Sequence, residues 1–300
     1  MLNKKSVIMT KITKISIITS FAGLWLTSYL SIEYQTILGF LLIFSFGILH
    51  GANDLVLINQ LNLEKNNQFL KIIAVYLLVI AISVVLFTKL SIVALLLFII
   101  VSGYHFGEQH WQGILENENS TLNKVFQFVY GLLILNLLFF FNSNEVIKIV
   151  FEITSLYLNI VLINSLLALN LVFLLLIGFM LYQKSIQFRA ALIEQLFYLL
   201  VLAVLFMSSS LIWGFTIYFI FWHSIPSLND QIKFLYGDAT ISNFKKYLKT
   251  ALVYWLVSLI GIIVLYFYSK DMVIFDALFF SFLASITFPH FIVMIKMYEK

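Results

Sequence analysis

Apolar runs of membrane-spanning length follow one another along almost the whole chain. A helix needs about 20 apolar residues to cross the hydrocarbon core of a bilayer, and ten runs come close to that length. The chain is 62% hydrophobic and only 11% charged, which is more apolar than a soluble domain requires. We therefore expect an all-α transmembrane helical bundle that forms one domain over residues 1–300. The expected spans are 15–30, 36–58, 69–88, 91–111, 122–141, 159–182, 190–207, 211–233, 251–268 and 272–297.

The distribution of Lys and Arg predicts how these spans are oriented. With the N-terminus inside and an even number of spans, fifteen of the 18 basic residues fall on the inner side. The exceptions are Lys89, Lys148 and Lys270. Basic residues favour the cytoplasmic side of a membrane. Both termini are therefore predicted to be cytoplasmic, in a multi-pass protein of the cell (inner or plasma) membrane.

Several classes of protein are excluded or disfavoured by what the chain lacks. Cysteine is absent, which excludes disulfides, iron–sulfur clusters and thiolate-bound metals. Basic and aromatic residues do not gather on a polar face, so nucleic acid is not an expected partner. The first apolar run is not followed by a small-residue cleavage site, which favours a span over a cleaved signal peptide. Residues 145–157 are apolar but carry charges, and we expect a short interfacial helix there.

The chain has only five histidines, and four of them are expected to lie at one depth in the membrane. His50, His105, His223 and His290 fall in the second, fourth, eighth and tenth runs, which are predicted to cross in the same direction. Each lies within about ten residues of the inner end, or roughly 10–15 Å along a helix. Titratable residues inside a membrane are costly and mark functional sites. We predict that these four imidazoles meet and bind a metal.

Three carboxylates are expected to support the histidines from outside the metal's ligand shell. A metal-bound imidazole usually donates its second N–H to a carboxylate or a carbonyl, which fixes its tautomer. The expected pairs are Asp54 with His50, Glu108 with His105, and Asp230 with His223, each on one face of a regular helix. A buried hydrogen bond or a proton relay would give the same spacing at any single pair.

The fifth histidine and the two prolines lie next to these positions. His110 is five residues after His105, so on a straight helix it points about 140° away. We expect it to act outside the ligand shell. Pro226 and Pro289 each lie within three residues of a histidine, and proline in a helix removes a hydrogen-bond donor and favours a kink.

Three short motifs resemble the Brp/Blh family of membrane-bound β-carotene 15,15′-dioxygenases. They are His50-Gly51-Ala52-Asn53-Asp54, Tyr104-His105-Phe106-Gly107-Glu108 and Trp222-His223-Ser224. The resemblance implies that the protein cleaves the central double bond of β-carotene with O₂ at a histidine-ligated Fe(II), giving two molecules of retinal. By position, it also implies that His50, His105 and His223 are iron ligands.

The resemblance leaves the fourth ligand open. The family's third motif has a second histidine one turn after the first, and here that position is Ser227. A neutral hydroxyl is a poor iron ligand. His290 is predicted at the right depth, on a helix running in the same direction and next to Pro289, so we expect it to take this role. His110 and water are the alternatives.

The expected substrate and oxidant are a carotenoid dissolved in the lipid bilayer and O₂. We nominate Tyr104, Phe106, Phe221 and Trp222 as walls of the substrate path because they adjoin the histidines; ordinary helix packing would explain them equally. A retinal-binding rhodopsin is one candidate acceptor of the product.

Three other functions compete with this interpretation. A membrane di-iron desaturase needs HxxxH and HxxHH clusters, which this chain does not have. A haem-binding electron-transfer protein could use histidine pairs on facing spans. A proton or metal transporter would be expected to show inverted repeats and broken helices, and no convincing repeat is present in the sequence.

Overall fold

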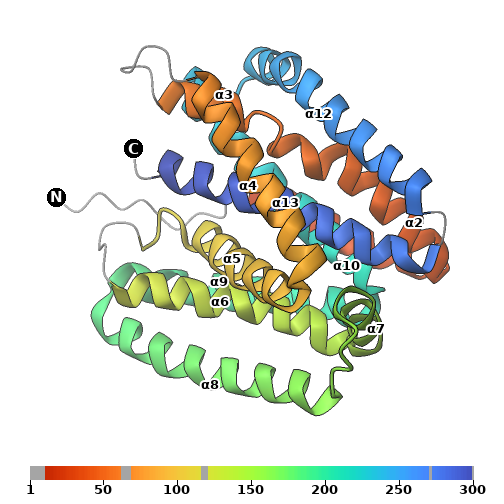
Figure 1. The fold of residues 1–300 in the computed structure, drawn as a ribbon. Coiled ribbons are helices and arrows are strands. Elements are labelled where there is room, and N and C mark those ends of the chain that lie inside the picture. The colour runs from red at the N-terminus through yellow and green to blue at the C-terminus, as the bar shows by residue number, and fades with distance from the viewer. Residues whose placement is uncertain (1–10, 62–68, 116–120, 270–271, 299–300) are drawn as a thin grey trace. The chain divides into compact units, whose positions relative to one another are not determined.

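A computed structural model describes residues 11–61, 69–115, 121–269 and 272–298, and every regular element in these ranges is helical (Figure 1). The α-helices are α1 (Lys11–Thr27), α2 (Ile32–Leu42), α3 (Asp54–Leu61), α4 (Phe69–Lys89), α5 (Ser91–Trp111), α6 (Thr121–Phe141), α7 (Ser143–Thr154), α8 (Ile160–Lys184), α9 (Ile186–Ser208), α10 (Leu211–Ile217), α11 (Ile225–Tyr236), α12 (Ile241–Ser269) and α13 (Met272–Tyr298). Three short irregular turns also occur: η1 (Ile43–Gly47) and η3 (Tyr218–Ser224) are π-helical, and η2 (Ile48–His50) is a 3₁₀-helix.

Eight helical segments of the described chain are long and apolar enough to cross a membrane. They are 32–61, 91–111, 121–141, 160–184, 186–208, 211–236, 241–264 and 278–298. These segments confirm the predicted all-α, polytopic architecture. Two of the ten expected spans also form helices but are shorter, since α1 has 17 residues and the apolar part of α4 is Ile73–Lys89. The predicted count of ten is therefore approximate.

The expected interfacial segment is also helical. The helix α7 covers Ser143–Thr154, close to the predicted range of 145–157. Glu145, in its first turn, accepts a hydrogen bond from the backbone N–H of Leu211 at 3.2 Å. Leu211 is the first residue of α10. Glu145 thus accepts from one of the backbone N–H groups that have no partner within the helix at the N-terminus of α10.

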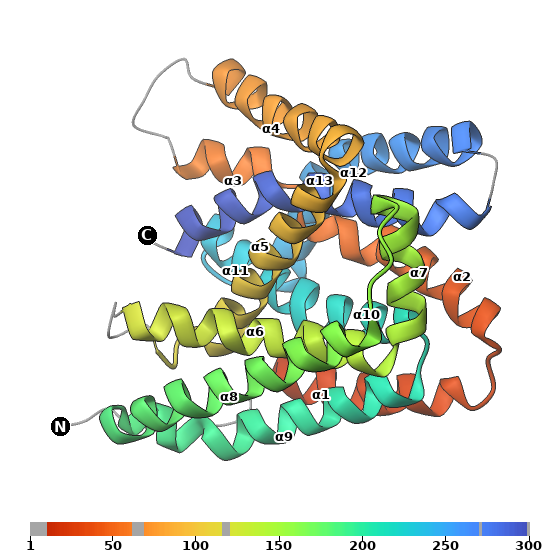
Figure 2. The ribbon, with the colours of Figure 1, turned by 60° about the horizontal axis from the view of Figure 1, so that its bottom comes forward.

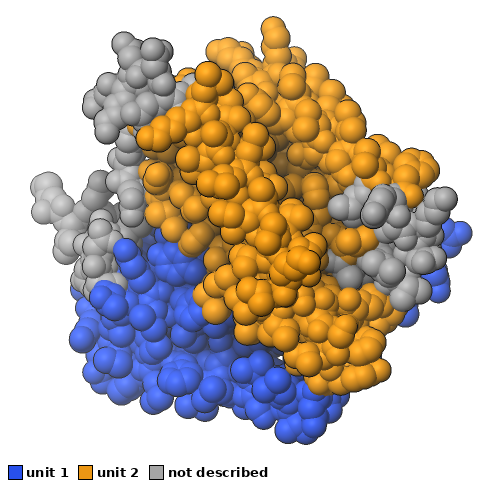
Figure 3. Space-filling model, in the orientation of Figure 1, with its two compact units in different colours: residues 1–42, 102–146, 159–226 blue, residues 43–101, 147–158, 227–300 orange. Residues whose placement is uncertain are grey.

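The helices pack into two compact units, which Figure 3 draws in different colours. Unit 1 comprises residues 1–42, 102–146 and 159–226, and unit 2 comprises residues 43–101, 147–158 and 227–300. In unit 1, α6, α8 and α9 lie side by side (Figure 2), and α10 packs against α2. In unit 2, α13 packs against α3, α4 and α12. The prediction of one domain over the whole chain stays a prediction.

Within unit 1, α5 and α6 touch backbone to backbone. A Cβ atom added to Gly107 would lie 1.7 Å from the carbonyl oxygen of Gln127, and one added to Gly131 would lie 1.8 Å from that of Gly103. Small residues allow such close helix crossings in membranes. Gly107 is thus required for helix packing, and the crossing fixes the part of α5 that carries His105.

Two predicted spans are interrupted by irregular turns. The run at residues 36–58 is not a single helix, because Gly51 donates its N–H to Ile48 three residues back, and α3 begins only at Asp54. In the run at residues 211–233, the N–H of Ile225 bonds to Ile220, five residues back. Such π-turns are often found at functional sites. Pro226 follows in the first turn of α11, where a missing N–H costs little, whereas α13 continues through Pro289.

Candidate metal-binding histidines

Unit 1 contains one pair of buried histidines. The rings of His105 on α5 and His223 on η3 lie edge to face, with 4.6 Å between their centroids and an interplanar angle of 79°. Each side chain is 1% exposed. The ring of Phe106 packs against that of His223 with centroids 4.8 Å apart, and Phe219 stacks on it at 5.5 Å. Two phenyl rings therefore contact the imidazole of His223.

Gln109 bonds to His223 at two points. Its Oε1 atom is hydrogen-bonded to Nδ1 of the His223 ring, and its Nε2 donates to the backbone carbonyl of His223 at 3.0 Å. Gln109 was not predicted from the sequence, where only carboxylates were expected to support the histidines. A signal was present, because Gln109 is four residues after His105 and so lies on the same face of α5.

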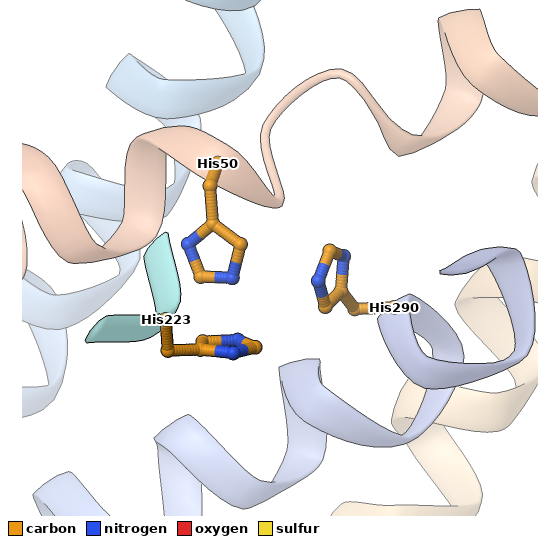
Figure 4. Close-up of side chains that lie close together, drawn as sticks. All are labelled: His50, His223 and His290. Atoms are coloured by element: carbon orange, nitrogen blue, oxygen red, sulfur yellow. The ribbon is translucent and has the colours of Figure 1, made fainter. Parts of the chain in front are cut away.

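Unit 2 contains a second pair of buried histidines, His50 and His290 (Figure 4). Their rings meet edge to face with centroids 4.7 Å apart and an interplanar angle of 86°. His50 is 5% exposed and His290 is 4% exposed. Nδ1 of His50 is hydrogen-bonded to the carbonyl oxygen of Gly47. In a regular α-helix the N–H of Gly51 would bond to the carbonyl of Gly47. Here it bonds to the carbonyl of Ile48 instead, so the carbonyl of Gly47 can accept from the ring of His50.

Asp54 supports His290 and not His50, contrary to the pairing predicted from the sequence. Its Oδ1 atom lies 2.8 Å from Nδ1 of His290, and its Oδ2 accepts a hydrogen bond from the hydroxyl of Tyr76 at 2.9 Å. The prediction assumed a regular helix from His50 to Asp54. The turn at residues 51–53 breaks that helix and redirects the carboxylate toward α13.

Tyr76 was not predicted as a site residue. It lies on α4 in an apolar run, and no spacing in the sequence connects it with Asp54. Only the packing of α4 in unit 2 brings its hydroxyl to the carboxylate.

The other two predicted carboxylates have different partners. Glu108 accepts a hydrogen bond from the hydroxyl of Tyr104 at 3.3 Å, one turn earlier on α5. Asp230 lies 3.9 Å from the ammonium group of Lys233, and its side chain is 32% exposed. The predicted alignment of Asp230 with His223 assumed regular helix throughout, and the π-turn at η3 interrupts it. The outer roles of Glu108 and Asp230 stay predictions.

His110 lies among aromatic rings of unit 1. Its ring is nearly parallel to those of Trp222 and Tyr218, with centroids 5.9 and 6.0 Å away, and it lies 5.6 Å from that of Tyr130. Its backbone carbonyl accepts a hydrogen bond from Gln195 at 3.3 Å. These contacts agree with the expectation that His110 points away from His105, and its outer role stays a prediction.

The four residues nominated as substrate walls are engaged in packing within unit 1. Phe106 lies edge to face with Tyr218 at 5.2 Å in addition to its contact with His223. The indole N–H of Trp222 donates to Ser20 at 2.8 Å. The remaining two are Phe221, whose carbonyl accepts from Ser16 at 2.5 Å, and Tyr104, which bonds to Glu108. A role in binding substrate stays a prediction for all four.

Ser227 occupies the place at which the resembling family has a second histidine. The residue is completely buried in unit 2, and its hydroxyl accepts a hydrogen bond from Gln231 at 3.1 Å. The Oε1 atom of Gln231 accepts in turn from the hydroxyl of Tyr247 at 2.7 Å. That hydroxyl also lies 3.1 Å from the carbonyl oxygen of His50. Ser227 thus belongs to a polar network that reaches the backbone of a candidate ligand.

One known protein family matches most of the chain. The family model described as beta-carotene 15,15'-dioxygenase matches residues 41–298. The chain belongs to this family. No curated protein and no solved structure matches the chain. The family match confirms the resemblance seen in the three motifs, and it spans His50, His105, His223 and His290. It supports a dioxygenase in preference to a haem-binding or transport protein.

Proposed function

We propose that this member of the β-carotene 15,15′-dioxygenase family cleaves the central double bond of β-carotene with O₂ and releases two molecules of retinal. The family match over residues 41–298 carries this proposal. The buried histidine pairs support it, because the chain has no thiol that could hold a redox metal instead. Enzymes that use O₂ commonly do so with a redox-active metal, and imidazoles are suitable ligands for non-haem iron.

We further propose that His50, His105, His223 and His290 hold one Fe(II). The chemistry of these side chains fits the metal. His50, His223 and His290, which Figure 4 draws as sticks, are buried, and each offers one ring nitrogen. Each also has its Nδ1 atom hydrogen-bonded to an oxygen. A neutral imidazole that donates from Nδ1 carries its lone pair on Nε2, which is the form that binds a metal.

When bound, the iron would supply the O₂ chemistry that no side chain of this protein can supply. The protein's own groups act on the ligands. The carbonyl oxygen of Gly47 orients His50, the amide of Gln109 orients His223, and the carboxylate of Asp54 orients His290. Phe106 and Phe219 cover the ring of His223 and exclude water from it. A dry environment of this kind protects reactive species from side reactions.

The substrate is a hydrocarbon and would reach the protein through the bilayer. Many of the large apolar side chains on the candidate spans are exposed, as expected for lipid-facing helices; Leu175, Phe179 and Val257 are 71%, 63% and 64% exposed. We propose the cell membrane as the location and lateral entry as the route. Transfer of retinal to a rhodopsin stays a prediction.

A bacterial host that accumulates β-carotene tests the activity in cells. Expression of the wild-type chain should bleach the cells and yield retinal in extracts, while a His105→Ala variant at equal membrane abundance should leave the carotene intact. Chromatography of the extracts measures both compounds. Carotene loss without retinal would contradict central cleavage, and unchanged carotene in cells with folded wild-type protein would contradict the proposed reaction.

A further inference from the structure

We propose that Gln109 is a positioning residue that holds His223 as the tautomer protonated at Nδ1 and so presents Nε2 to the metal. This inference rests on the proposed role of His223 as a ligand. It adds a residue that is neither a histidine nor a carboxylate to the groups that organise the site. Both residues belong to unit 1.

The two contacts of Gln109 together determine which way its amide faces. The backbone carbonyl of His223 can only accept a hydrogen bond. The atom of Gln109 that lies 3.0 Å from this carbonyl must therefore be the NH₂ group. The amide oxygen then faces the ring, where it bonds to Nδ1. The opposite orientation would place two oxygens against each other, so an orientation that is usually ambiguous is fixed by its surroundings.

The orientation of the amide in turn determines the tautomer of the ring. An amide oxygen has no hydrogen to donate, so a hydrogen bond between it and Nδ1 requires the proton to be on Nδ1. A neutral His223 in this state has its lone pair on Nε2. The same two contacts also fix the plane of the ring, because the amide is bonded to the ring and to the backbone of one residue.

The backbone on both sides of this contact is well placed to hold it. Gln109 is two residues after Gly107, where α5 lies directly against α6. His223 lies in the π-helical turn η3, in which the hydroxyl of Ser224 donates to the carbonyl of Phe219 at 2.7 Å. Gln109 therefore lies on a tightly packed helix, and His223 lies on an irregular turn. The backbone of such a turn constrains the imidazole ring less than a regular α-helix would, so the contact with Gln109 matters more.

The other two histidines with a described Nδ1 contact use different acceptors for the same purpose. His50 uses the carbonyl of Gly47, and His290 uses the carboxylate of Asp54. Since each acceptor serves one ring, loss of the Gln109 amide should disturb His223 alone. This selectivity separates a positioning role from a general contribution to folding.

Ring-nitrogen NMR on metal-free protein tests the tautomer directly. The protein would be labelled with ¹⁵N in its histidine rings and reconstituted in lipid nanodiscs, and the His223 signals would be assigned from a His223→Gln variant. We expect wild-type His223 to carry its proton on Nδ1. We expect Gln109→Leu to lose this preference. Gln109→Glu loses the donor to the backbone carbonyl of His223 but keeps an oxygen acceptor for the ring, so we expect it to retain the proton on Nδ1. A wild-type His223 protonated at Nε2 would overturn the proposal even if no variant folded.

Gln195→Leu is the matched control. Gln195 is a buried glutamine of unit 1. Like Gln109 it donates to the backbone carbonyl of a histidine, but this histidine is His110, and its oxygen accepts from the hydroxyl of Tyr130 at 3.0 Å. Its variant should leave the tautomer of His223 unchanged. A shift of His223 as large as that in Gln109→Leu would show a general packing effect and overturn the proposal.

Iron retention against a competing chelator gives a second readout. Loss of a residue that is hydrogen-bonded to a metal ligand typically lowers the affinity for the metal by about 10- to 100-fold. We expect Gln109→Leu to lower the affinity for Fe(II) by about that factor and Gln109→Glu to lower it less. Unchanged affinity in Gln109→Leu would refute the positioning role. Because the tautomer is measured without metal or substrate, failure of the wild-type chain to cleave β-carotene would refute the proposed function separately.

Discussion

Replacing His290 with alanine should remove iron and activity as completely as replacing His105, whereas His110→Ala should retain iron. His290 is buried, lies edge to face with His50, and has its Nδ1 atom bonded to Asp54, so Nε2 is the nitrogen that we propose for the metal. His110 lies nearly parallel to the rings of Trp222 and Tyr218. With Ser227 bonded to Gln231, we expect His290 to be the fourth ligand.

Iron content of the three variants decides this prediction. Each would be purified without oxygen, checked for thermal unfolding against the wild type, and analysed for iron per chain by mass spectrometry. His105→Ala and His290→Ala should be nearly free of iron, and His110→Ala should hold as much as the wild type. If folded His290→Ala keeps a full complement of iron, the fourth ligand is another group, with water or His110 as the alternatives.

Asp54→Asn should lower the affinity for iron by about 10- to 100-fold, because the carboxylate orients His290 and strengthens its basicity. Asp54 is 1% exposed and bonds to both His290 and Tyr76. An asparagine of the same shape keeps an acceptor but has no charge. Tyr76→Phe should have a smaller effect in the same direction, since it removes only the hydrogen bond that holds the carboxylate.

Asp230→Asn is the matched control for this second prediction. Asp230 is partly exposed and pairs with Lys233 on the surface of α11, so its replacement should leave iron affinity unchanged. Competition with a chelator of known affinity measures all three variants. Equal affinities of Asp54→Asn and the wild type would show that the bond between Asp54 and His290 is structural only. The turnover of Asp54→Asn should fall along with its iron occupancy.

The sequence predicted the fold class well because that class depends on composition, and it singled out the histidines because they are rare in apolar runs. Apolar runs of span length identify membrane helices whatever their local geometry. Histidines inside such runs are rare because burying a titratable group in the membrane is costly, and they therefore indicate functional sites. His50 and His290, about 240 residues apart in the sequence, do form a buried pair in unit 2, and so do His105 and His223 in unit 1.

The partners of the histidines were harder to predict because they depend on the winding of the helix. The spacing of four between His50 and Asp54 predicts contact only on a regular helix, and η2 and the following turn break it. Hydrophobic periodicity does not reveal a hydrogen bond displaced by one residue, as in η3. Gln109 and Tyr76 were missed for a second reason: neutral polar side chains carry no distinctive signal in an apolar run.

The most direct test of iron-dependent central cleavage uses purified protein in lipid nanodiscs with β-carotene and O₂. Metal-free protein, the same protein loaded with one Fe(II) per chain, and protein loaded with Zn(II) would be compared, with products quantified by chromatography. The proposed function predicts two retinal molecules for each β-carotene consumed by the iron form and none from the other two. Equal cleavage by metal-free protein, a requirement for two irons, or products of unequal length would contradict it.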